Sequence, residues 1–183
     1  PETYSMVRVS DGMAQNAVLA IAMARRLGVS STQVQAGLSH WKPSAMRGEI
    51  REDQGRLVYL DCYNANPAAM ADALAAFSEI VPDDLPRLYV LGGMEELGND
   101  SDAQHHALGE SLKLRTGDRV IAIGTGAKFV KAGALAAGAS DEQITVLRES
   151  SPATESVSVW PGALFIKGSR RRALNDAFLP GRL

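Results

Sequence analysis

The heptapeptide DCYNANP at 61–67 combines a carboxylate, two amides and a predicted helix start. Asp61 ends an apolar run, and Asn66 before Pro67 is the pattern of a helix N-cap followed by proline at the first helical position. The free N–H groups of a helix start favour anions, so this loop could hold a ribose, a phosphate or a carboxylate. Capping by Asn66 and a turn at Asn64 explain the same residues. The spacing alone leaves both interpretations open.

A second candidate is the tetrapeptide Lys167-Gly168-Ser169-Arg170, in which two cations bracket a Gly-Ser turn ahead of a predicted helix. Backbone N–H, hydroxyl and guanidinium groups together are donors suited to a carboxylate. The alternative is a capped helix with a solvated basic patch. For the two further arginines at 171–172 we favour that alternative.

The segment GTGAKF at 124–129 is similar to part of a dinucleotide-binding fingerprint, because it follows a predicted strand and opens a predicted helix. Glu149 ends the next strand, as a ribose-binding acid would. Phe129, however, occupies the third glycine position, where a side chain hinders close packing of helix on strand. A stand-alone dinucleotide-binding module using Gly124 and Gly126 is therefore the alternative hypothesis. The sequence contains no G-x-x-x-x-G-K-[ST] phosphate loop.

The remaining reactive residue types predict neither a catalytic residue nor a metal ligand. Glu95 and Glu96 could act on a ligand, but a solvated acidic loop is the commoner explanation. His105 and His106 are neighbours on a predicted helix and so point in different directions; we expect one to be packed and the other exposed. Cys62 ends an apolar run with no cation nearby in sequence, which favours a small buried filler over a nucleophile.

Composition restricts the class of protein. The 183 residues are 45% hydrophobic and 22% charged, which is the ordinary globular range. A net charge of −2 provides no basic field for nucleic acid. The single cysteine excludes an internal disulfide and a cysteine zinc cluster. No apolar run is long enough to cross a bilayer, so we expect a cytoplasmic protein without membrane insertion.

The elements that would position these residues fall into two parts. Residues 13–27 and a shorter segment after a capping box of Ser30 and Gln33 predict two helices, which end at Trp41-Lys42-Pro43. Residues 49–52 and 56–60 then predict a hairpin around Asp53-Gln54-Gly55. The hairpin's second strand, extending over 57–61, begins an alternation of strands and helices. Further strands are expected at 87–91, 119–123, 144–147 and 163–167, and helices at 67–80, 102–114, 127–137, 152–159 and 170–178.

Short apolar strands separated by amphipathic helices predict a parallel sheet covered on both faces. The expected fold class is α/β: a Rossmann-like, mostly parallel sheet with helices on both faces and an N-terminal β-hairpin, preceded by a short helical segment. We place the domain boundary between 1–43 and 44–183. Ligands of open α/β sheets bind outside the carboxyl ends of the strands. This rule places the following loops on one edge: 61–66, 92–98, 124–128, 148–151 and 167–170.

In this order, the motifs resemble those of the Mur ligases over nearly the whole chain. The resemblance rests on YNANP at 63–67 after an acidic strand end, GGMEELG at 92–98, His105, and KGSR at 167–170. It is nearest to the Mur ligases that add D-alanyl-D-alanine to a UDP-N-acetylmuramoyl tripeptide. Residues 1–43, with MAQN at 13–16, resemble the helical tail of the family's central ATP-binding domain. Residues 44–183 resemble its Rossmann-like C-terminal domain.

The resemblance implies part of an ATP-dependent ligase of peptidoglycan precursor synthesis. ATP, with Mg²⁺, would phosphorylate the carboxylate of a UDP-N-acetylmuramoyl peptide, and the amine of D-Ala-D-Ala would attack the acyl phosphate. The central domain holds the ATP phosphate loop and most of the Mg²⁺ contacts, and it is almost wholly missing. A chain starting at Pro1 is thus expected to be cut from a longer protein, to be inactive alone, and to need the N-terminal and central domains as partners.

The resemblance also assigns roles to residues on the loops. The residues implied to face ATP are Arg47, Asp61, Asn64 and Asn66. The residues implied to face the incoming amino compound are Lys167, Gly168, Ser169 and Arg170.

Two departures from the family pattern bear on these roles. Gly12 stands where the family commonly has histidine before MAQN, and Gly93 replaces the usual acid of G-D-M-x-E-L-G. The alternatives that stay open are another Mur-type ligase with a different amino acceptor, the dinucleotide module, and a non-catalytic remnant that serves as an interaction domain.

Overall fold

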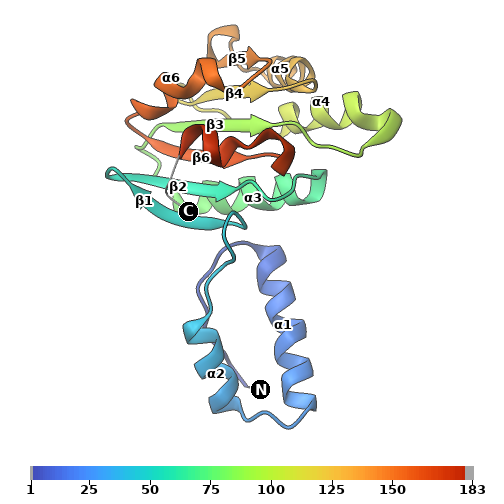
Figure 1. Ribbon diagram of the computed structural model, residues 1–183, viewed down its shortest axis with the longest axis vertical. Helices are drawn as coiled ribbons and strands as arrows, with labels where there is room; N and C mark the ends of the chain where they lie inside the picture. Colours follow the sequence, from blue (N-terminus) through green and yellow to red (C-terminus); the bar gives the residue numbers. More distant parts are fainter. Residues whose placement is uncertain (1, 180–183) are drawn as a thin grey trace.

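The computed structural model describes residues 2–179, except for the side chain of Arg172. It has an N-terminal helical arm and an α/β unit (Figure 1). The arm consists of α1 (Asp11–Arg26) and α2 (Ser31–His40). In Figure 1 it extends below the sheet, which it meets near the start of α1.

The α/β unit follows the predicted alternation of strands and helices. Its strands are β1 (Glu49–Asp53), β2 (Arg56–Asp61), β3 (Arg87–Gly92), β4 (Arg119–Ile123), β5 (Ile144–Leu147) and β6 (Ala163–Lys167). Its α-helices are α3 (Pro67–Ile80), α4 (Ser101–Ser111), α5 (Ala127–Ala136), α6 (Thr154–Ser158) and α7 (Leu174–Phe178). Short 3₁₀ turns are η1 (Gly98–Asp100), η2 (Asp141–Gln143), η3 (Ser151–Ala153) and η4 (Arg170–Arg172).

The strands form one sheet in the order β1-β2-β6-β3-β4-β5. β1 and β2 pair as the antiparallel hairpin, and the other pairs are parallel. The predicted α/β fold class is therefore confirmed. The last strand, β6, lies between β2 and β3, so the carboxyl ends of the first and last parallel strands are neighbours.

Helices cover both faces of the sheet, because successive strand residues point to opposite sides. Tyr59 and Phe165 point toward α3, where their rings stack at 5.4 Å between centroids and Phe77 packs against them. Leu60 and Ile166, one residue further along each strand, belong to a second core that includes residues of α6 and α7. Both cores are fully buried at the central strands.

Local signals set most helix starts. Asn66 Oδ1 accepts a hydrogen bond from Ala69 N–H at 2.8 Å, and Pro67 occupies the first helical position of α3. Ser30 and Gln33 form the predicted capping box of α2. Both caps confirm the sequence interpretation.

Two helix ends differ from expectation. α4 ends at Ser111, three residues early, where Leu112 becomes extended and is buried in the core beneath α3–α5. The last helix, expected over 170–178, is broken: η4 ends at Arg172, Ala173 has a left-handed φ of 45°, and α7 begins at Leu174. This break brings Leu174 and Phe178 into the core on the opposite face.

Among residues 2–179, none of the helices combines the length and the apolar character that crossing a bilayer requires.

Candidate functional site

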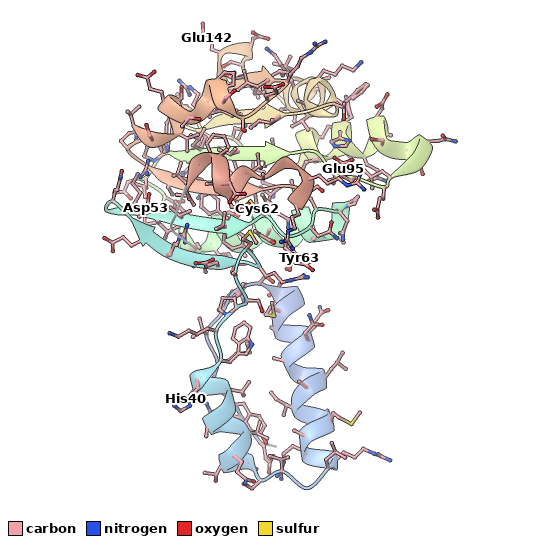
Figure 2. The ribbon with its side chains drawn as sticks, in the orientation of Figure 1. His40, Asp53, Cys62, Tyr63, Glu95 and Glu142 are labelled. Atoms are coloured by element: carbon pink, nitrogen blue, oxygen red, sulfur yellow. The ribbon has the colours of Figure 1, made fainter. Side chains whose placement is uncertain are left out.

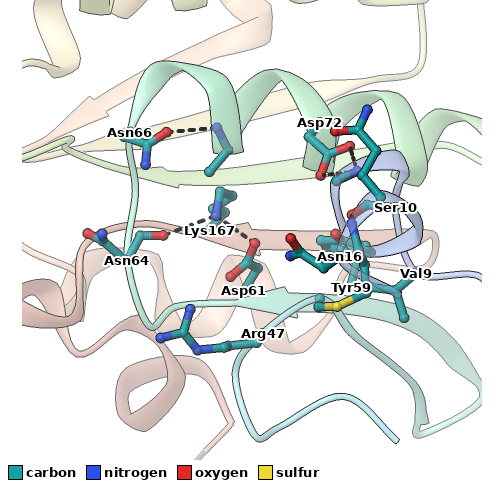
Figure 3. A pocket seen from close by; sticks show the side chains of 15 residues that line it. Val9, Ser10, Asn16, Arg47, Tyr59, Asp61, Asn64, Asn66, Asp72 and Lys167 are labelled. Atoms are coloured by element: carbon teal, nitrogen blue, oxygen red, sulfur yellow. Dashed lines mark hydrogen bonds and ion pairs between the residues drawn. The ribbon is translucent and has the colours of Figure 1, made fainter. Parts of the chain in front are cut away.

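The centre of the site is an ion pair between neighbouring strands. Asp61 ends β2 and Lys167 ends β6, and the two residues are aligned in the parallel pairing. Lys167 Nζ lies 2.6 Å from Asp61 Oδ2 and also donates to the backbone oxygen of Asn64 at 3.0 Å (Figure 3). Lys167 is 1% exposed, so this buried ammonium is already used inside the protein.

Burial and the ion pair shift the pKa of the Asp61 carboxyl in opposite directions. Burial raises the pKa of the Asp61 carboxyl, while the ammonium of Lys167, and after it the guanidinium of Arg47, lower it. Removing water strengthens the attraction between opposite charges at this distance. The pair consequently ties the ends of β2 and β6 and the following loop into one arrangement.

The amides of the loop have the local roles that capping predicts. Asn64 Oδ1 accepts from the Ala65 N–H at 2.9 Å, and Asn66 caps α3 as described above. Both side chains also line the cavity described next. Local structure and ligand binding are thus compatible here, since Asn66 uses its oxygen for the cap and Asn64 uses its oxygen within the loop, and each keeps its NH₂ group for a ligand.

A cavity of about 390 Å³ lies between the start of α1 and the α/β unit. Figure 3 shows side chains from both parts converging on it. Its lining includes all the residues expected to face ATP, together with Lys167 and residues from the arm: Ser10, Gly12, Asn16, Arg47, Asp61, Asn64, Asn66, Asp72 and Lys167. The structure therefore brings the ATP-side residues together and adds Lys167, which was expected on the acceptor side.

Asp72 is a site residue that sequence reasoning missed. Its carboxylate accepts the N–H of Gly12, with the amide nitrogen 3.1 Å from Oδ1 and 3.3 Å from Oδ2. A Cβ on Gly12 would lie 2.8 Å from Oδ2. Arg8 pairs with Glu79 beside this contact. The backbone N–H of Gly12, at a departure from the family pattern, thus connects the start of α1 to α3; nothing in the spacing signals a contact across 60 residues.

The two cations of the KGSR loop have different neighbours. Lys167 contacts Asp61, whereas the Arg170 guanidinium lies 5.6 Å from the ring centre of Tyr63. Between them, Gly168 packs against Gly92, where a Cβ would lie 2.8 Å from the Gly92 Cα. The Ser169 N–H donates to the Gly93 carbonyl at 3.3 Å. Gly93, the second family departure, contributes through its backbone.

Tyr63 brings Arg47 and Arg170 together. The Arg47 guanidinium stacks 3.7 Å from the same ring centre. Tyr63 is 40% exposed, at the point where the arm meets the α/β unit (Figure 2). The sequence shows only an aromatic residue within a polar loop; its two cationic neighbours are distant along the chain and are visible only in the fold.

His105 is the packed member of the histidine pair, as expected, at 2% exposure, and the His106 side chain is 38% exposed. Nε2 of His105 accepts the Met94 N–H at 3.0 Å, and Nδ1 lies 2.7 Å from the Ser101 carbonyl. Nδ1 therefore carries the proton in a neutral ring that holds the 92–98 loop. A Cβ on Gly126 would overlap this ring. Close packing on His105 accounts for Gly126 without a dinucleotide.

Cys62 is buried at 1% exposure and donates to the Ile166 carbonyl, which agrees with its expected role as a filler. Burial raises the pKa of its thiol to about 12. The thiolate, which is the reactive form, is thus scarce at neutral pH.

We expect iodoacetamide at pH 8 to label Cys62 at least about 100-fold more slowly in the native chain than in denaturant. The pKa of the Cys62 thiol is higher in the folded state, so in the unfolded chain this thiol loses its proton at a lower pH. The free energy of unfolding therefore falls as the pH rises above the ordinary thiol pKa of 9.0. Mass spectrometry measures the labelling, and Cys62→Ala should make the alkaline fall in stability shallower. Equal labelling rates in the native and unfolded chains would contradict the assignment.

The family model for the glutamate ligase domain of Mur ligases matches residues 46–169. This chain belongs to the Mur ligase family. Members of this family are ATP-dependent amide ligases, and the matched residues include the Asp61–Lys167 pair and the YNANP loop.

The named relatives that this chain is similar to include MurF ligases. The chain is 28% identical over 165 residues to the UDP-N-acetylmuramoyl-tripeptide–D-alanyl-D-alanine ligase of Escherichia coli, covering 88% of this chain and 35% of that protein. MurF from Acinetobacter baumannii has the same fold, with a TM-score of 0.78 at 24% identity over 95% of this chain and 38% of that one. MurF from Thermotoga maritima, solved in complex with ADP, gives 0.74 at 22% identity, with 96% and 38% covered. The Mur ligase chain described here thus spans little more than a third of these relatives.

Proposed function

We propose that this chain is the C-terminal part of a MurF-type ligase, which joins D-Ala-D-Ala to a UDP-N-acetylmuramoyl peptide. Residues 1–43 are then the tail of a central ATP-binding domain, and 44–183 are the C-terminal domain. The observation that carries the proposal is the cavity at their junction, where Arg47, Asp61 and the two asparagines face the start of α1. The reaction belongs to the cytoplasm, where ATP and nucleotide-linked precursors are available.

The exposed apolar surface of α1 supports the division at 43. None of the residues of α1 is buried, and large side chains stand open to solvent: Val18 at 63%, Leu19 at 70%, Met23 at 58% and, just beyond the helix, Leu27 at 76%. Isolated exposed apolar residues are common, but a run along one short helix marks a contact surface. The rest of the central domain would cover it.

The proposed reaction makes an amide through an acyl phosphate. The peptide carboxylate takes the γ-phosphoryl group of ATP, which leaves ADP. The amine of D-Ala-D-Ala attacks the acyl carbon, a proton leaves the nitrogen, and collapse of the tetrahedral intermediate breaks the C–O bond and releases phosphate. Mg²⁺ would neutralise phosphate charge, and the family resemblance assigns most of its contacts to the central domain.

In this reaction the residues of this chain bind and orient rather than bond covalently. Arg47 offers an unpaired guanidinium to phosphate, and Asp61 is held by Lys167. The unpaired guanidinium of Arg170 suits the carboxylate of the dipeptide, with Gly168 and Ser169 shaping the turn. Lys167 acts on this side through the loop that it anchors. Positioning and exclusion of water by domain closure would supply the rate enhancement.

The proposal is tested with the complete polypeptide that joins this chain to an ATP-binding central domain. We expect ADP release that depends on both the UDP-N-acetylmuramoyl tripeptide and D-Ala-D-Ala, with kcat/KM reduced at least about 10-fold by Arg47→Ala. Tyr4→Leu, on the arm away from the cavity, is the matched control. Ligation of L-alanine, D-glutamate or a diamino acid in preference to the dipeptide would reassign the acceptor within the family. An unchanged kcat/KM in both Arg47→Ala and Asp61→Ala would refute the site.

A further inference from the structure

Tyr63 has a geometry that capping and ligand binding by the loop do not explain. Its ring is 40% exposed and is approached by two guanidinium groups, from Arg47 at 3.7 Å and from Arg170 at 5.6 Å. The two arginines are far apart in the sequence: Arg47 precedes β1 and Arg170 follows β6. A cation over an aromatic face is attracted by the ring's quadrupole.

The ring is the anchor that the structure provides for both cations. Among residues 2–179, neither guanidinium has a hydrogen bond or an ion pair within the protein, in contrast to Lys167. All their N–H donors therefore remain available to an anion. Without the ring, each long side chain would sample many rotamers, and a ligand would have to order it on binding.

The backbone of Tyr63 acts on the same segment. Its N–H donates to the Met46 carbonyl at 3.2 Å, and Met46 holds a left-handed φ of 60° immediately before Arg47. The loop that carries Arg170 is attached separately, by the Ser169–Gly93 hydrogen bond. Tyr63 thus lies between two independently anchored loops.

We infer that Tyr63 is a positioning residue, whose ring presents Arg47 and Arg170 together to the anionic groups of the two ligands. The inference rests on the proposed function, in which Arg47 faces ATP and Arg170 faces the acceptor. Binding of ATP and binding of the acceptor would then both depend on one aromatic ring. Tyr63 itself needs no contact with the reacting atoms. The Tyr63 hydroxyl is dispensable, because the two guanidinium groups lie over the face of the ring.

The first experiment tests the geometry in this chain alone, independently of any activity. Side-chain Nε–Hε resonances of Arg47 and Arg170 are assigned by NMR in the wild-type chain, Tyr63→Leu and Tyr63→Phe. We expect both resonances to lose their ring-current shifts in Tyr63→Leu and to keep them in Tyr63→Phe, with Tyr4→Leu as the control for loss of an unrelated tyrosine. Resonances that do not move in Tyr63→Leu would overturn the inference.

The second experiment measures kinetics in the complete ligase. Tyr63→Leu is expected to raise the KM of ATP and the KM of D-Ala-D-Ala about 10-fold each, with kcat within about 3-fold, and Tyr63→Phe is expected to restore both KM values. A merely structural role would lower the melting temperature and leave both KM values unchanged, which would refute the inference. If the wild-type ligase prefers another acceptor, the proposed function fails.

The positioning role is then decided separately, with pyrophosphate as the probe in this chain. Pyrophosphate should shift the Arg47 and Arg170 resonances in the wild-type chain and in Tyr63→Phe at several-fold lower concentration than in Tyr63→Leu. Equal titration curves for the three chains would overturn the inference, whatever the acceptor.

Discussion

Replacing Lys167 with methionine is expected to destabilise the chain by about 3 kcal/mol at pH 7. Methionine fills similar volume but removes the ammonium from a position that is 1% exposed, where it pairs with Asp61 at 2.6 Å. The Asp61 carboxylate is then left largely buried without its counter-charge, and the Asn64 carbonyl loses a donor. Urea denaturation monitored by circular dichroism measures the loss.

The control for this prediction is the double variant Lys167→Met/Asp61→Asn. Because it removes both charges, we expect its stability to return to within about 1 kcal/mol of wild type. In the single variant, Asp61 lacks its main pKa-lowering partner, so its pKa rises further in the folded state. The folded chain then binds a proton that the unfolded chain releases, and the deficit shrinks as pH falls from 7 toward 5. A single variant within about 1 kcal/mol of wild type at pH 7 would show that the pair does not organise the site.

Replacing Gly133 with alanine is expected to destabilise the chain by about 2 kcal/mol, although alanine is the better helix former. Gly133 on α5 faces the His106 carbonyl of α4 so closely that a Cβ would overlap its oxygen. Gly109 on α4 meets the Val130 carbonyl of α5 in the same way. The two backbones are therefore in direct contact, and an added methyl group must push the helices apart.

Two other glycines provide matched controls. Gly37, inside α2, has nothing within 4 Å of its Cβ position, and Gly117, in the α/β unit, meets only Pro86 at an ordinary 3.6 Å. Alanine at either position is expected to be neutral or to stabilise by up to about 1 kcal/mol. Thermal and urea unfolding of the four alanine variants make the comparison. Gly133→Ala and Gly109→Ala as stable as the controls would refute direct contact between the helix backbones.

The sequence by itself predicted what depends on near neighbours. The N-cap at Asn66 with Pro67, the Ser30 capping box and the alternation of strands and helices follow from local hydrogen bonding and side-chain periodicity. The rule for open α/β sheets placed the loops after Asp61 and Lys167 on one edge, and the structure pairs these two residues at the ends of neighbouring strands. These features can be predicted from the sequence because they depend on interactions between residues a few positions apart along the chain.

Tertiary structure decided the contacts that build the site. Lys167 meets Asp61 across 106 residues because β6 inserts beside β2, a strand order that the alternation of elements leaves open. The Gly12–Asp72 contact, the shared ring of Tyr63 and the break at Ala173 likewise depend on which surfaces pack together. A buried charge must find its partner wherever the fold places one. For that reason the loops could be predicted from the sequence, whereas the pairing of their side chains required the three-dimensional structure.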